Sequence, residues 1–125
     1  MAETEPIEGE ALALAAAGYA DDQGGEEISV IDLRGISSIA DFFVVCTGTS
    51  TPHLKALRRE VSEKLAEEHG VRARAIDGKP ESQWLVLDYI DVLVHIFHKD
   101  RRDSYSLEDL WSDAPRIAFE SAGAG

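Results

Sequence analysis

The segment Phe42-Phe-Val-Val-Cys-Thr47, followed by Gly48-Thr-Ser-Thr-Pro52, decides the fold. Its nearly continuous apolar run predicts a strand that is buried on both faces. Thr51 is a suitable N-cap and Pro52 is favoured at the first helical position, so a helix should begin here. The helix should have an apolar stripe at helical spacing, formed by Leu54, Leu57, Val61 and Leu65. Gly70 is expected to end it. A buried strand leading through a tight turn into a helix of about 18 residues predicts a strand–helix–strand unit.

Further strands are predicted on both sides of this unit. Ile28–Leu33 is short and rich in β-branched residues, as strands are. Val71–Ile76 alternates small apolar with mostly polar residues, which favours a strand near a sheet edge. Trp84–Tyr89 and Asp91–Phe97 are two apolar runs that form either a hairpin or one bent ribbon. We therefore expect an α/β protein built on one sheet.

The ends of the chain frame a single expected domain of residues 10–115. Residues 1–9 are acidic and contain Pro6, which predicts a disordered lead, whereas the alanine-rich residues 10–20 predict a helix. A short final helix is expected around Leu107, Leu110 and Trp111. Residues 116–125 are expected to be a flexible tail.

The charge is unevenly distributed along the 125 residues, whose net charge is −12. Residues 1–33 hold nine acidic side chains and no lysine or arginine, while the other 92 residues carry 15 acids against 12 bases. Direct binding to a phosphate backbone is disfavoured, because it requires clustered basic groups. A basic protein surface is the better electrostatic match. The single cysteine, Cys46, and the lack of a long apolar run favour a cytoplasmic protein without a membrane span.

Few residues suggest a metal site or a nucleophile. His95 and His98 are three apart on a predicted strand and so face opposite sides, with no further cysteine or histidine nearby to complete a zinc site. His95 lies in an apolar run and is expected to be a buried side chain with its hydrogen bonds satisfied. Cys46 lies in the most apolar strand, where a thiol is inert. We expect no metal, no cofactor and no enzymatic activity.

The Gly48–Ser50 turn supports an alternative hypothesis of a nucleotide-binding enzyme. A turn that opens a helix offers free amide groups to phosphate, and it resembles the Gly-Ser turn of nucleotidyltransferases. Those enzymes also require a pair of carboxylates on the next strand to hold magnesium. Here Asp77 stands alone after that strand, and Asp88 and Asp91 are three apart, which breaks the requirement for one face. Close packing at a capped turn is sufficient to explain the glycine.

The strand face that carries Trp84 can be interpreted in two ways. Alternation places Trp84, Val86 and Asp88 on one face of a strand and Leu85, Leu87 and Tyr89 on the other. An exposed sheet face bearing tryptophan or tyrosine is a natural docking surface, because these residues dominate interface energetics. Alternatively, a helix of the same chain covers the face. Periodicity alone does not decide between the two.

Several motifs together resemble the ribosomal silencing factor (Iojap) family. The resemblance covers about residues 27–115, and the motifs occur in the expected order. The first two are Ser37-Ser-Ile-Ala-Asp-Phe-Phe-Val-Val-Cys-Thr-Gly-Thr-Ser50 and Asp77-Gly78 leading to Trp84-Leu-Val-Leu-Asp-Tyr89. The last two are Asp91-Val-Leu-Val-His-Ile-Phe97 and Arg102 through Tyr105-Ser-Leu-Glu-Asp-Leu-Trp111. The resemblance implies an α/β sandwich with a mixed sheet, related to nucleotidyltransferases but without their catalytic carboxylate pair.

The same resemblance implies a partner and a mode of action. Members of this family bind the large ribosomal subunit through its protein number fourteen, block joining of the small subunit and thereby repress translation; homodimers are also expected. By match of motif, the residues implied in the partner contact are Trp84, Asp88, Tyr89, Arg102 and Tyr105. The chain departs from the family pattern at Ser104, where an aromatic residue is usual, and at Ile90, where glycine is usual. The family pattern does not explain the acidic lead.

Overall fold

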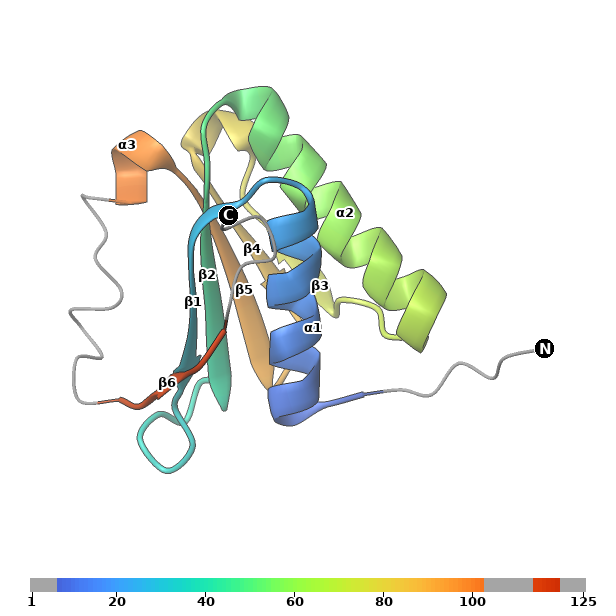
Figure 1. Ribbon diagram of the computed structural model, residues 1–125, viewed down its shortest axis with the longest axis vertical. Coiled ribbons are helices and arrows are strands. Elements are labelled where there is room, and N and C mark those ends of the chain that lie inside the picture. The colour runs from blue at the N-terminus through green and yellow to red at the C-terminus, as the bar shows by residue number, and fades with distance from the viewer. Residues whose placement is uncertain (1–6, 103–113, 120–125) are drawn as a thin grey trace.

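A computed structural model describes residues 7–102 and 114–119 of the chain. Within these ranges helices and strands follow one another as an α/β arrangement (Figure 1). The elements are α1 (Gly9–Asp22), β1 (Glu26–Asp32), β2 (Phe42–Gly48), α2 (Thr51–His69), β3 (Ala75–Asp77), the 3₁₀ turn η1 (Pro80–Ser82), β4 (Trp84–Asp88), β5 (Val92–His98), α3 (Lys99–Arg102) and β6 (Arg116–Ile117).

The strands form one mixed six-stranded sheet in the order β3-β4-β5-β2-β1-β6. Its central pair, β2 and β5, is parallel, with Val44 opposite Val94. The other neighbouring pairs are antiparallel. Trp84–Tyr89 and Asp91–Phe97 therefore form a hairpin rather than a bent ribbon, and α2 begins the crossover that returns the chain to the parallel neighbour of β2.

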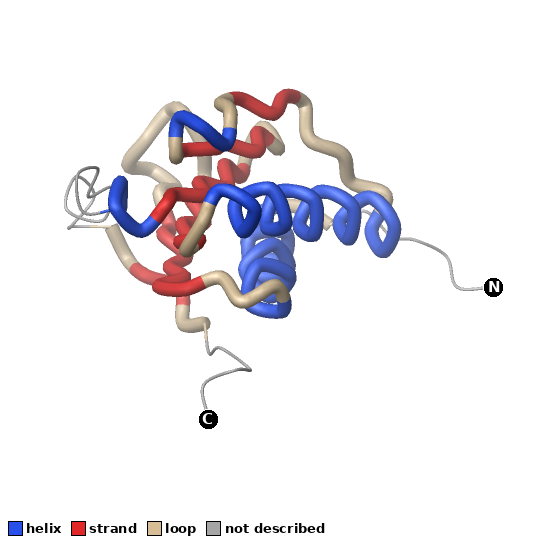
Figure 2. Tube along the Cα trace, turned by 90° about the horizontal axis from the view of Figure 1, so that it is seen from above, coloured by secondary structure: helices blue, strands red, loops and turns tan. Residues whose placement is uncertain are grey.

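Helices α1 and α2 pack side by side on one face of the sheet (Figures 1 and 2). The main core lies between them and the sheet, and it includes the four stripe residues of α2, which are fully buried: Leu54, Leu57, Val61 and Leu65. Every residue of β2 is buried, as the apolar run predicts. The strand–helix unit expected from this stretch is therefore confirmed.

The α2 helix begins one residue earlier than the sequence indicates. Ser50, not Thr51, is the N-cap, and its hydroxyl oxygen accepts a hydrogen bond from the backbone N–H of His53 at 3.2 Å. Both residues can cap a helix, so the motif alone does not distinguish them. At the other end Gly70 adopts the left-handed conformation, with φ of 66°, as expected of a terminating glycine.

Two predicted segments differ from the observed structure. Only residues 75–77 form β3, because residues 71–73 leave the end of α2 without strand pairing; β3 is an edge strand, as expected. The expected flexible segment from residue 116 begins instead with β6, whose Ile117 pairs with Val30 of β1. The short helix predicted around Leu107, Leu110 and Trp111 lies outside the described residues.

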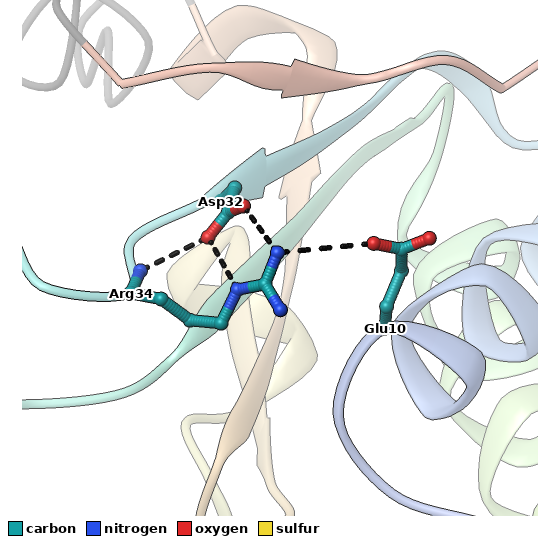
Figure 3. Close-up of polar contacts among 3 residues, drawn as sticks. All are labelled: Glu10, Asp32 and Arg34. Atoms are coloured by element: carbon teal, nitrogen blue, oxygen red, sulfur yellow. Dashed lines mark hydrogen bonds and ion pairs between the residues drawn. The ribbon is translucent and has the colours of Figure 1, made fainter.

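An ion-pair cluster ties the start of α1 to the end of β1 (Figure 3). The Arg34 guanidinium donates to both carboxylate oxygens of Asp32, at 3.0 and 2.7 Å, and lies 3.9 Å from Glu10. The hydrogen bonds from Arg34 lower the pKa of Asp32. Arg34 also lies over the ring of Phe42, 4.9 Å from its centroid. Among the described residues, no helix is long and apolar enough to cross a membrane.

Candidate partner-binding site

The face of the sheet opposite α1 and α2 carries a second, smaller apolar cluster. Strand β4 contributes to both faces as its alternation predicts: Leu85 and Leu87 are fully buried toward the helices, whereas Trp84, Val86 and Asp88 are half-buried on the opposite face. Trp84 packs against the second cluster, which consists of Ile31, Leu33, Ala40, Phe43, Val45, Phe97 and Ala114. We call the half-buried side chains Trp84, Val86 and Asp88 the β4 open face.

The indole of Trp84 is held by two neighbours on β5. It stacks on Phe97 with the ring centroids 5.0 Å apart and the planes tilted by 26°. Its Nε1–H donates to Nδ1 of His95 at 3.2 Å. His95 is only 6% exposed, and burial lowers its pKa to about 4, so the imidazole is neutral near pH 7 and can accept this bond.

The prediction that His95 is buried is confirmed, but its hydrogen bonding is only half satisfied. Its ring also meets Phe43 edge-on, with centroids 4.6 Å apart. His95 Nε2 is buried and has no hydrogen-bond partner within the described part of the chain. His98 lies on the helix side of β5 by alternation, and its Nδ1 accepts from the backbone N–H of Asp100 at 3.1 Å.

Asp88 stabilises the turn between β4 and β5. One carboxylate oxygen accepts from the Arg74 guanidinium at 2.7 Å, and the other accepts from the backbone N–H of Ile90 at 2.8 Å. The bond from Arg74 lowers the pKa of Asp88. Ile90 has φ of 77°, which is unusual for a β-branched residue, and its side chain is 62% exposed. The turn therefore needs the left-handed backbone that glycine adopts without strain.

Tyr89 lies in the core rather than beside Trp84. It is 5% exposed, packs in the helix-side cluster, and its hydroxyl has no hydrogen-bond partner among the described residues. Burial raises the pKa of Tyr89 to about 12. The residues that the resemblance implied in one contact thus divide between two faces of the sheet, and we leave Tyr89 out of the contact proposed below.

The two remaining residues implied in the contact lie at or beyond the end of the described core. Arg102 is the last residue of α3, which follows β5 directly. Tyr105 lies outside the described residues. Sequence reasoning did not identify Arg74 and His95 as the partners of Asp88 and Trp84, although alternation on neighbouring strands could have placed His95 and Trp84 on one face.

The Gly48–Ser50 turn is occupied by interactions within the chain. The backbone N–H of Thr49 donates to Nδ1 of His53 at 2.9 Å, and Ser50 caps the helix. A Cβ on Gly48 would lie 2.7 Å from Cδ2 of the fully buried Leu54, so a larger residue there would force this part of the core to shift. These contacts favour the packing explanation of the glycine over a phosphate cradle.

Asp88 and Asp91, the two carboxylates that the sequence places near each other, lie away from the turn. Asp88 is opposite Leu93, which is opposite Phe43, and Phe43 lies five residues before Gly48 along β2. At about 3.3 Å per residue, Asp88 is roughly 17 Å from the turn along the strand direction. Within the described ranges no three histidine, cysteine or acidic side chains are arranged to hold a metal ion.

Comparisons with known proteins agree on one family. The family model described as "Ribosomal silencing factor during starvation" matches residues 6–124. The Ribosomal silencing factor RsfS of Bacillus subtilis is 43% identical over 100 residues, which are 80% of this chain and 84% of that protein. The mouse protein named Mitochondrial assembly of ribosomal large subunit protein 1 is 30% identical over 95 residues, covering 72% of this chain and 40% of its own length.

A solved structure shows the same fold. The crystal structure of a Chromobacterium violaceum protein superposes with a TM-score of 0.79 at 30% identity, over 94% of this chain and 98% of the other. The fold is thus shared over nearly the whole chain. The protein belongs to the ribosomal silencing factor family.

Proposed function

We propose that the protein represses translation by binding the large ribosomal subunit through its protein number fourteen and blocking the joining of the small subunit. Membership of the family supports the broader statement that it is a translation regulator acting on the ribosome. The observation that carries the narrower proposal is the β4 open face, where half-buried Trp84 lies on the side of the sheet away from α1 and α2. Tryptophan in such a position is a typical interface anchor.

The name of one relative and the charge of the chain both favour the large subunit as the binding partner. The mouse relative is named for the assembly of the large ribosomal subunit. With a net charge of −12, the protein would be repelled by exposed ribosomal RNA and attracted to a basic ribosomal protein. We therefore place the contact on protein, with no direct recognition of nucleic acid sequence.

The proposed mechanism is steric and requires no reaction. A protein bound on the face where the two subunits meet occupies volume that the small subunit must fill. The contact would use Trp84 and Asp88, with Arg102 and Tyr105 following from the resemblance. A cytoplasmic location, a homodimer and the absence of enzymatic activity and cofactors complete the proposal.

Cosedimentation tests the proposed partner. We expect the protein to travel with isolated large subunits in a sucrose gradient and to be absent from assembled ribosomes. Added before the small subunit, it should lower the yield of assembled ribosomes. Equal recovery on large subunits and on assembled ribosomes would refute the steric mechanism.

The Trp84→Ala variant tests the contact residue. Removing an interface anchor should weaken binding to large subunits by about 2 kcal/mol or more, which is roughly thirtyfold. Ile39→Ala is a suitable control, because Ile39 is a large apolar side chain, 65% exposed, in the connection between β1 and β2. If both variants are folded and bind equally well, Trp84 is not part of the site.

A further inference from the structure

We propose that His95 is a positioning residue, which fixes the indole of Trp84 in the one orientation that the large subunit contacts. The inference rests on the proposed function, because it assumes that Trp84 forms part of the contact. It adds a residue that is itself buried and that acts on the partner only through Trp84.

The hydrogen bond from the indole determines which nitrogen of His95 carries the proton. The indole Nε1–H can only donate, so His95 Nδ1, 3.2 Å away, must be the acceptor and the proton must lie on Nε2. A charged imidazole carries protons on both nitrogens and could not form this bond. The near-complete burial of the ring independently favours the same neutral form.

The hydrogen bond to His95 distinguishes two orientations of the indole that stacking alone does not distinguish. Stacking on Phe97 fixes the plane of the indole, but a ring turned over by half a rotation stacks about equally well. The bond to His95 favours one of these two orientations, with the polar edge of the ring turned toward β5. Because the N–H donor is already used inside the protein, the contact that Trp84 offers to a partner is apolar.

Packing does not explain why this position carries histidine. His95 lies among aromatic rings, with Phe43 4.6 Å away and Phe97 6.2 Å away between centroids. Its Nε2 is buried without a hydrogen-bond partner in the part of the chain that the structure describes, and such a group destabilises a fold. An apolar side chain would avoid that cost but would provide no acceptor for the indole.

Two variants of His95 that nearly match each other in shape separate a positioning role from a purely structural one. His95→Asn places an amide oxygen close to the position of Nδ1 and keeps an acceptor, whereas His95→Leu has a similar shape and none. Both variants shorten the side chain, so both should lose similar stability. The indole resonance of Trp84 in the free protein, assigned by its loss in Trp84→Phe, should keep its hydrogen-bonded chemical shift in His95→Asn and change in His95→Leu.

Binding to isolated large subunits then tests the functional part. Loss of one hydrogen bond should lower the affinity of His95→Leu about fivefold, while His95→Asn stays within about twofold of the native protein. In a Trp84→Phe background, which has no N–H to position, His95→Leu should cause no further loss. That dependence on Trp84 would not be seen if His95 had only a structural role.

The outcomes distinguish the inference from the function on which it rests. Native affinity in His95→Leu, in a protein whose Trp84→Ala variant binds weakly, would overturn the positioning role alone. Equal losses for His95→Leu with and without the indole N–H would also overturn it. Native affinity in Trp84→Ala would instead refute the proposed contact, and the positioning inference with it.

Discussion

Lowering the pH from about 7 to about 5 should destabilise the protein through His95. Its pKa falls from 6.5 to about 4 on folding, because burial disfavours the charged imidazole. The unfolded chain therefore takes up a proton near pH 6.5 that the folded protein does not take up until about pH 4. The stability that depends on neutral His95 is present above pH 6.5 and is lost progressively as the pH falls toward 4.

The size of the effect follows from the two pKa values. At pH 5 the unfolded state is almost fully protonated at this residue and the folded state almost not at all. The linkage relation then gives a loss of about 2 kcal/mol in the free energy of unfolding between pH 7 and pH 5. The pKa values of Asp32 and Asp88 are also lowered, from an ordinary value of 3.8. Both carboxylates therefore change charge mainly below pH 4 and contribute little to the change in stability between pH 7 and pH 5.

Urea denaturation at the two pH values measures this loss. His95→Leu keeps the three other histidines, so the difference between its pH dependence and that of the native protein isolates His95. The variant should lose about 2 kcal/mol less than the native protein over the same interval. Identical pH dependence in the two proteins would refute a buried, neutral His95.

Three further substitutions have outcomes that follow from single contacts. Gly48→Ala should lower the free energy of unfolding by about 1–3 kcal/mol, since its Cβ would lie 2.7 Å from Leu54 Cδ2; an unchanged urea midpoint would contradict this close packing. Tyr89→Phe removes a buried hydroxyl without a partner among the described residues, so stability should rise by about 1 kcal/mol and affinity for large subunits should not change; weaker binding would return Tyr89 to the contact. Ile90→Asn should raise the melting temperature, because asparagine tolerates φ of 77° better than isoleucine, and a lower one would show that the exposed Ile90 side chain stabilises the fold.

The parts of the fold that sequence predicts best are those where one physical signal dominates. The stripe from Leu54 to Leu65 has the period of a helix and nothing opposes it, and Phe42–Thr47 is apolar throughout. Val71–Ile76 also alternates, but alternation does not reveal where a neighbouring strand is available, and only its last two residues enter β3. Strand β6 is two residues long and depends on pairing with β1, so local sequence carries almost no signal for it.

The candidate site shows the same limit at the level of single residues. Alternation correctly placed Trp84 and Asp88 on one face and Tyr89 on the other. It did not show that Asp88 binds Arg74, or that the nitrogen of His95 lies against the indole, because these contacts depend on the register between neighbouring strands, which alternation along one strand does not fix. The left-handed Ile90 was indicated only by the resemblance to a family in which glycine is usual there.

Among the described strands, β2 and β5 are the one parallel pair, and they join two parts of the sheet that are each built from antiparallel strands. Residues 26–48 and residues 75–98 each contain antiparallel neighbours connected by short segments, and these can form through local contacts. Pairing of β2 with β5 must instead close the long connection that includes α2. Because long-range closure slows folding, joining the two halves is expected to be the slow step, with α2 formed before β2 and β5 meet.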